Sequence, residues 1–205
     1  MTSPGKSPRT PGTIVLVAAL GGTLIFASPT LRDFLEREES GARGVVLTVY
    51  ADKLAGGLPT VCDGLTRHVT RTPIIVGQRW TPEQCERETR AALVRVQQSL
   101  VKCFRILPPQ SVFDMASSHA WNNGAPNTCA SAALRAWNGG QFELGCRRLA
   151  LSDGGKPVWS YVRTGKTLPN GKPEMRFVQG LQDRRQRELK LCQQLADYKP
   201  GDATW

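Results

Sequence analysis

The feature that most constrains this chain is a run of 22 uncharged residues from Thr10 to Leu31, which follows Lys6 and Arg9. Basic residues before an uncharged segment are typical of export signals, and a helix of about 20 residues can cross the hydrocarbon layer of a bilayer. The run is rich in Gly, Ala, Thr and Ser and poor in large apolar side chains. It therefore predicts a weak membrane anchor, with the N-terminus in the cytosol and the remainder of the chain exported.

A signal peptide that is cleaved off is the alternative interpretation of this segment. No good small-x-small cleavage site precedes Arg32, and Pro29 would hinder cleavage after Ser28. We therefore expect residues 1–31 to form an uncleaved signal anchor and residues 32–205 to form one domain.

Six cysteines lie in the exported part, and an even number behind an export signal predicts disulfide bonds. Six cysteines allow fifteen pairings. Pairing of consecutive cysteines closes loops of moderate length, so we expect the bonds Cys62–Cys85, Cys103–Cys129 and Cys146–Cys192. There is no C-x-x-C motif and there are two histidines, so neither a metal site nor another cofactor is expected.

The formal net charge of the chain is +10, which favours an anionic partner. Nucleic acid, anionic lipid and an acidic cell-wall polymer would all satisfy that charge. An export segment argues against nucleic acid, because an exported protein leaves the compartment that holds it. The membrane surface and the cell wall remain as the expected partners.

The first exported residues predict a helix followed by a small antiparallel sheet. Apolar residues at helical spacing indicate a short helix over 31–37, which ends near Glu38 and Glu39. The β-branched stretch 45–50 predicts a strand, Gly56-Gly57 a turn, and 58–62 a second strand.

The rest of the chain is predicted to be mainly helical. Capping signals and helical periodicity indicate helices at 81–102, 108–122, from Asn127 or Thr128 to Trp137, 141–150, and from Pro173 to about 195. Residues 153–173 are rich in Gly, Lys, Pro and Asn and predict an exposed loop. The expected fold is α+β, with a small β-hairpin lobe, a larger helical lobe and a cleft between them.

The acids near the predicted hairpin suggest hydrolysis of a glycosidic bond. That reaction needs a protonated acid beside the leaving oxygen and a carboxylate on the opposite face, with a group to hold the attacking water if water attacks directly. Glu39 (or Glu38), Asp52 and Thr60 are the candidates. The alternative is a solvated acidic helix end, an ordinary turn residue and an ordinary strand residue.

Several short motifs follow one another in a fixed order. They are Leu35-x-x-Glu38-Glu39, Tyr50-x-Asp52, TVCDGLT at 60–66, QSVFDMASSHAWNNG at 110–124 and GLQDRRQRELKLC at 180–192. In this order they resemble the phage lysozymes of glycoside hydrolase family 24, over about residues 34–195. The weakly hydrophobic N-terminal segment together with the T-V-C motif is similar to the signal-anchor-release subgroup of endolysins.

The resemblance implies a lysozyme-like fold and an exported muramidase that lyses the bacterial host. Such an enzyme cuts the β-1,4 bond between N-acetylmuramic acid and N-acetylglucosamine in peptidoglycan. By position Glu39 would be the general acid, Asp52 would orient water or stabilise positive charge, and the Thr60 hydroxyl would hold the water. The family inverts the anomeric centre. We expect a monomer, first on the periplasmic face of the host inner membrane and then, after release, in the periplasm.

The spacing of the acids departs from the family pattern. Glu39 lies thirteen residues before Asp52, whereas the family usually has nine, and the residue nine positions before Asp52 is Arg43. A guanidinium does not give up its proton, so Arg43 cannot act as the acid. An insertion at residues 40–43 accounts for the difference. A site without its acid, and Glu38 in place of Glu39, are the alternatives.

The resemblance also points to residues beyond these three. His119, Trp121 and Asn122, at the end of the motif 110–124, are the expected substrate-binding residues. The tryptophans of this region can instead be buried core residues. Cys62, beside Thr60, either makes a structural bond with Cys85 or takes part in a redox switch that depends on the anchor.

Two other functions compete with the muramidase. A peptidoglycan peptidase or amidase would use Cys62 or Cys129 as nucleophile and His68 or His119 as base, which would leave a cysteine unpaired. A membrane-anchored protein that binds the cell wall without catalysis is the second alternative.

Overall fold

The computed structural model describes residues 12–17, 21–39, 44–52 and 56–195. The chain divides into two compact units. Among the described residues, those within 12–16 and 23–94 belong to the first unit, and those within 17–22 and 95–195 belong to the second.

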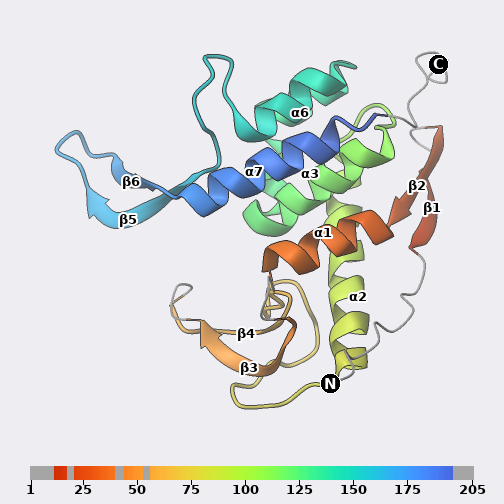
Figure 1. Cartoon of the computed structure of the whole chain (residues 1–205), viewed down its shortest axis with the longest axis vertical. Helices are drawn as coiled ribbons and strands as arrows, with labels where there is room; N and C mark the ends of the chain where they lie inside the picture. Colours follow the sequence, from red (N-terminus) through yellow and green to blue (C-terminus); the bar gives the residue numbers. More distant parts are fainter. Residues whose placement is uncertain (1–11, 18–20, 40–43, 53–55, 196–205) are drawn as a thin grey trace, which may run out of the picture. The chain divides into compact units, whose positions relative to one another are not determined.

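The first unit contains a helix, a β-hairpin and most of a second helix (Figure 1). These elements are α1 (Pro29–Glu39), β3 (Val46–Asp52), β4 (Leu58–Cys62) and α2 (Pro82–Val101). The helix–strand–strand–helix order agrees with the sequence prediction. Burial of apolar side chains from each element explains the arrangement, with Leu31, Phe34, Leu35, Val49, Val61 and Leu93 at most 3% exposed.

The two strands of the hairpin pair antiparallel around a turn at Gly56 and Gly57. Both glycines have positive φ, which favours glycine in a tight turn. The other edge of β3 is also covered, because Trp80 N donates to Leu47 O at 2.8 Å. The backbone hydrogen bonds on both sides of β3 hold the strand in place.

A disulfide and an ion pair are among the side-chain links that join α2 to the rest of this unit. The disulfide Cys62–Cys85 connects the last residue of β4 to the first turn of α2, as predicted. On α1, the buried Arg32 guanidinium forms an ion pair with Glu86 of α2. The helix is therefore tied both to the hairpin and to α1.

The second unit is mainly helical and includes a second β-hairpin (Figure 1). Its elements are α3 (Gln110–Asn123), α4 (Ala125–Cys129), α5 (Ala132–Asn138), α6 (Phe142–Ala150), β5 (Tyr161–Thr167), β6 (Pro173–Phe177) and α7 (Gln179–Cys192). Every residue of α3 from Val112 to Ala120 is buried, so this helix forms the centre of the unit. The predicted disulfides Cys103–Cys129 and Cys146–Cys192 are both present.

The predicted helix from Asn127 or Thr128 to Trp137 was wrong. The chain forms two short helices there, α4 and α5, and the second begins after Ser131. The Ser131 hydroxyl accepts a hydrogen bond from Leu134 N at 3.0 Å, which makes Ser131 the capping residue.

The predicted loop at 153–173 and the predicted helix start at Pro173 were also wrong. Residues 161–177 form the β5–β6 hairpin, and α7 begins at Gln179. Most side chains of the hairpin are exposed on both faces, so the sequence lacks the apolar alternation that predicts a strand. Phe177, which lies within the predicted helix, is on β6 and is 40% exposed.

The predicted signal anchor overlaps two short strands, β1 (Thr13–Val17) and β2 (Gly22–Phe26), which pair with each other. Its residues 1–11 and 18–20 lie outside the described part of the chain. Within the described ranges, the structure has no helix with the length and apolar character needed to span a bilayer. The anchor stays a prediction.

Close packing between α5 and α6 gives a test of the second unit. A Cβ added at Gly145 of α6 would lie 2.2 Å from Cδ1 of Trp137, a side chain that is fully buried. Gly145→Ala should therefore lower the free energy of unfolding by about 1–3 kcal/mol, because the core is overpacked. Denaturant unfolding of the oxidised protein measures this.

Gly180→Ala is the matched control, since no atom lies within 4 Å of the Cβ it would add to α7. It should be neutral or slightly stabilising, because alanine is the better helix former. Equal stability of Gly145→Ala and Gly180→Ala would contradict the packing of α5 on α6.

Candidate active site

Asp52 and Thr60 lie on the same face of the β3–β4 hairpin. Tyr50 pairs with Thr60, and Asp52 pairs with Leu58. Because side chains alternate along a strand, Asp52 and Thr60 are diagonal neighbours on one face and are not directly opposite each other. The hairpin brings the two predicted site residues together and places Tyr50 beside them.

The Thr60 hydroxyl has a defined orientation. The side chain is 4% exposed, and its Oγ1 donates a hydrogen bond to Leu58 O at 3.0 Å. A hydroxyl has one proton and two lone pairs, so Oγ1 is left as an acceptor. Such a group can accept a hydrogen bond from a water molecule and thereby orient it.

Tyr50 links the hairpin to the end of α1 through electrostatics. Burial raises the pKa of the Tyr50 phenol, and the negative charges of Asp52 and then Glu39 raise it further. Both carboxylates therefore act on the same phenol. The sequence analysis quoted the Tyr50-x-Asp52 motif without giving the tyrosine a role. Its position two residues before Asp52, on the same strand face, was the signal that could have identified it.

Glu38 and Glu39 are the last two residues of α1. Glu39 is exposed and Glu38 is half-buried. The predicted insertion at residues 40–43, which includes Arg43, lies outside the described part of the chain.

The end of β4 is held by a tight turn. Val61 and Leu65 exchange two backbone hydrogen bonds, with N–O distances of 3.0 and 2.9 Å, and both side chains are fully buried. Between them, Cys62 has a φ of +55°, which is uncommon for a residue with a side chain. Its disulfide to Cys85 anchors the strand two residues after Thr60.

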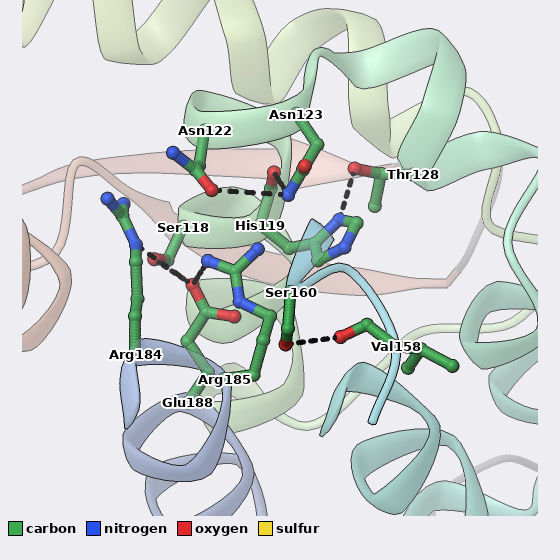
Figure 2. Close-up of polar contacts among 10 residues, drawn as sticks. All are labelled: Ser118, His119, Asn122, Asn123, Thr128, Val158, Ser160, Arg184, Arg185 and Glu188. Atoms are coloured by element: carbon green, nitrogen blue, oxygen red, sulfur yellow. Dashed lines mark hydrogen bonds and ion pairs between the residues drawn. The ribbon is translucent and has the colours of Figure 1, made fainter. Parts of the chain in front are cut away.

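The three residues expected to bind substrate have different surroundings in the second unit. His119 is fully buried, and its Nδ1 lies 2.8 Å from the Thr128 hydroxyl (Figure 2). Its ring meets that of Trp159 edge to face, with centroids 4.6 Å apart. Trp121 is half-buried, and Asn122 is exposed. Of the three, Trp121 and Asn122 therefore reach solvent.

A buried ionic cluster lies next to His119 and was not predicted. Glu188 accepts hydrogen bonds from Ser118 and Arg185, each at 2.7 Å, and lies 3.5 Å from Arg184 Nε (Figure 2). Burial raises the pKa of Glu188, while Arg185, Arg184 and Ser118 oppose that change. The pattern R-R-x-x-E in the sequence was the available signal, since it places three charged groups within one helical turn.

All six cysteines are in disulfides, so the alternative of a Cys–His peptidase or amidase has no thiol nucleophile. In the described ranges, no group of three or more His, Cys, Asp or Glu side chains is placed to hold a metal ion.

A family model described as phage lysozyme matches residues 40–188 of the chain. The matched range includes Asp52 and Thr60 and begins one residue after Glu39. No match was found among the curated proteins.

Several solved structures are similar in fold. The endolysin from Escherichia coli O157:H7 phage FAHEc1 has a TM-score of 0.63 at 23% identity, with 84% of this chain and 95% of that chain covered. The muramidase domain of SpmX from Asticaccaulis excentricus has a TM-score of 0.61 at 20% identity, covering 81% and 96%. A mutant of P22 lysozyme has a TM-score of 0.59 at 23% identity, covering 82% and 97%. The predicted α+β, lysozyme-like fold is confirmed.

The environment of His119 predicts a pH dependence of stability. Burial and the charges of Arg185 and Arg184 hold its pKa well below the usual value, so the folded protein keeps His119 neutral. The unfolded chain binds this proton below about pH 6.5. The contribution of His119 is therefore fully present above that pH and is lost as the pH falls towards the folded-state pKa.

Between pH 7.5 and 5.5 this effect should lower the free energy of unfolding by an amount on the order of 1 kcal/mol. His119→Asn should remove that part of the pH dependence, as measured by denaturant unfolding at both pH values. His68→Asn, which changes the exposed histidine of the chain, is the control and should leave the dependence unchanged. An unaltered dependence in His119→Asn would contradict a neutral buried imidazole.

Proposed function

The chain belongs to the phage lysozyme family, and we propose that it is an exported muramidase with Glu39 as its acid and Asp52 and Thr60 as the residues that activate water. As a member of this family it is a glycoside hydrolase that acts on peptidoglycan, an endolysin. The proposal adds the bond that it cuts, the roles of the residues and the place where it acts.

The observation that carries the assignment is the shared effect of two carboxylates on Tyr50. Glu39 comes from the end of α1 and Asp52 from the end of β3, yet both raise the pKa of the same phenol. Thr60 pairs with that tyrosine across the hairpin. These three residues offer an acid, a carboxylate and a hydroxyl, which is the set that direct hydrolysis of a glycosidic bond requires, and their relation to Tyr50 supports the assignment.

In the proposed mechanism Glu39 donates a proton to the leaving oxygen of the bond between N-acetylmuramic acid and N-acetylglucosamine. Asp52 accepts a hydrogen bond from a water molecule on the opposite face of the sugar and takes up its proton as the water attacks. Thr60 Oγ1, whose own proton is given to Leu58 O, accepts the second hydrogen bond from that water. A single displacement by water inverts the anomeric centre.

Diagonal neighbours across an antiparallel pair are typically about 7–8 Å apart at the backbone. This spacing leaves room between Asp52 and Thr60 for a water that both side chains contact. The diagonal register therefore suits the water-holding role better than direct opposition, in which the two side chains would meet.

Trp121 and Asn122 are proposed to contact the glycan, because both reach solvent at the end of α3. His119 takes a different role from the one expected. Its bond to Thr128 and its buried position make it a positioning residue that connects the end of α3 to α4.

The enzyme is proposed to act at the periplasmic face of the host inner membrane and, after release of its anchor, in the periplasm as a monomer. Disulfide bonds support an oxidising compartment outside the cytosol. The net charge of +10 favours the anionic surfaces found there.

Glu38 is the second candidate for the acid, because it is the neighbouring carboxylate at the end of α1 and is less exposed than Glu39. The other alternative is a differently built site without an acid at this position, because Arg43 stands at the family's usual spacing from Asp52.

Glu39→Gln should reduce lysis by a factor of about 10²–10⁴, because the leaving oxygen loses its proton donor. Clearing of chloroform-treated Gram-negative cells and release of reducing ends from purified peptidoglycan measure this. Glu38→Gln and Glu36→Gln are the matched controls on the same helix and should stay within a few-fold of the unaltered protein. Normal lysis by Glu39→Gln would remove Glu39 from the mechanism, and loss in Glu38→Gln alone would move the role to Glu38.

The anchor is tested by alkaline carbonate extraction of membranes from energised cells that express the full-length chain. An uncleaved anchor should leave the intact protein in the membrane pellet, because an apolar segment held in lipid resists alkaline washing. N-terminal sequencing of the retained protein should begin at Met1 or Thr2. A soluble protein trimmed near residue 31 would support the cleaved signal peptide instead.

A further inference from the structure

The hairpin formed by β5 and β6 carries large apolar side chains on one exposed face. Tyr161 pairs with Phe177, and Arg163 pairs with Met175, so these four side chains share a face. The two rings meet edge to face with centroids 5.5 Å apart. Tyr161, Met175 and Phe177 are 42%, 47% and 40% exposed. We refer to these four residues as the aromatic face of the hairpin.

The opposite face of the hairpin is polar. Thr164 donates a hydrogen bond to Glu174 Oε2 at 2.6 Å, and Val162 pairs with Arg176. Glu174 is the one carboxylate between residues 161 and 177. Glu174 lies on the opposite face and accepts a hydrogen bond from Thr164. The hairpin therefore has no acidic side chain next to its exposed apolar groups.

The hairpin is also rich in exposed cations. The hairpin has four of them, and all four are exposed: Arg163, Lys166, Lys172 and Arg176. Leu168, at the tip between the two lysines, is 40% exposed. The hairpin therefore combines exposed apolar side chains with an excess of positive charge. This combination favours a partner that is anionic and also has apolar surface.

We propose that the aromatic face docks on the anionic surface of a lipid bilayer. Tyrosine and phenylalanine rings, methionine and leucine can insert between lipid head groups, while the neighbouring lysine and arginine side chains pair with lipid phosphates. Peptidoglycan would match the charge through its peptide carboxylates. Its sugars and peptides, however, offer little apolar surface to Met175 and Leu168, so the bilayer fits the whole set of side chains better.

The aromatic face is held in position before it meets a partner. At the base of the hairpin, Val178 N donates to Ser160 O at 2.8 Å, and the Ser160 hydroxyl donates to Gln182 of α7 at 2.7 Å. Ser160 is fully buried. The hairpin extends from the start of α7 (Figure 1). Docking would therefore cost little ordering of the chain.

This contact is separate from the N-terminal segment and does not depend on which carboxylate is the catalytic acid. It would keep the enzyme at the membrane surface after the anchor has left the bilayer. The N-terminal segment would insert mainly through its apolar groups, whereas docking of the hairpin should depend strongly on anionic lipid.

The test measures co-sedimentation of the full chain with vesicles of phosphatidylethanolamine and phosphatidylglycerol, and with vesicles of phosphatidylcholine alone. The ratio of the two partition coefficients isolates the charge-dependent contact. Lys166→Gln with Lys172→Gln should lower this ratio by about 30-fold, because each cation near an anionic surface contributes about fivefold. Tyr161→Ser with Phe177→Ser should lower binding to the anionic vesicles at least about tenfold, since two buried rings are lost.

Matched control variants lie in the first unit. Ile75→Ser with Val76→Ser removes two exposed apolar side chains, and Arg67→Gln with Arg71→Gln removes two exposed cations. In both control variants the ratio of partition coefficients should stay within about twofold of that of the unaltered protein, because the substituted residues do not belong to the hairpin. Activity on purified peptidoglycan, which should be unchanged in all variants, verifies that each protein is folded.

Three outcomes would overturn the proposal. One is an unchanged ratio in both hairpin variants. Another is an equal loss in the control variants, which would assign the effect to net charge alone. The third is unchanged vesicle binding together with reduced binding to isolated sacculi, which would make the hairpin a contact for the cell wall.

Discussion

The disulfide between Cys62 and Cys85 is the constraint on which the proposed site depends most. A two-stranded hairpin is only marginally stable by itself in water, and β4 has five residues. The bond ties its last residue to the first turn of α2, while Arg32 and Glu86 tie the same turn to α1. Glu39 and Thr60 therefore sit on elements that share one support. Strand β3, which carries Asp52, is held by backbone hydrogen bonds along both edges.

Much of the fold could be predicted from local signals. Capping residues and apolar periodicity predicted the bounds of α2, α3 and α6 to within a few residues. The order of the cysteines predicted all three disulfide bonds. The β5–β6 hairpin could not be found in this way, because its exposed faces lack alternation. Pro173 followed by Glu174 also imitates the start of a helix. The segment around Ser131 was misread because two short helices in succession keep nearly the same periodicity as one long helix.

The site was predictable in its composition but less so in its geometry. The turn at Gly56-Gly57 could be predicted, yet the register that makes Asp52 and Thr60 diagonal neighbours depends on pairing that residue types do not specify. Burial of His119 was not readable either, because polar residues in the middle of α3 suggest a surface. In the structure, Ser118 and His119 instead face a buried set of charges from α7, and this pairing is a tertiary effect.

Each of the three disulfide bonds joins a cysteine to the next cysteine along the chain. A polypeptide that crosses a membrane from its N-terminus presents its thiols one at a time. An oxidase that joined them simply in order of arrival would thus produce the native connectivity, and no bond would have to be broken and remade. Interleaved bridges would need reshuffling, which takes seconds to hours. If the thiols pair in the order in which they arrive, formation of these three bridges therefore requires an oxidant but no isomerase.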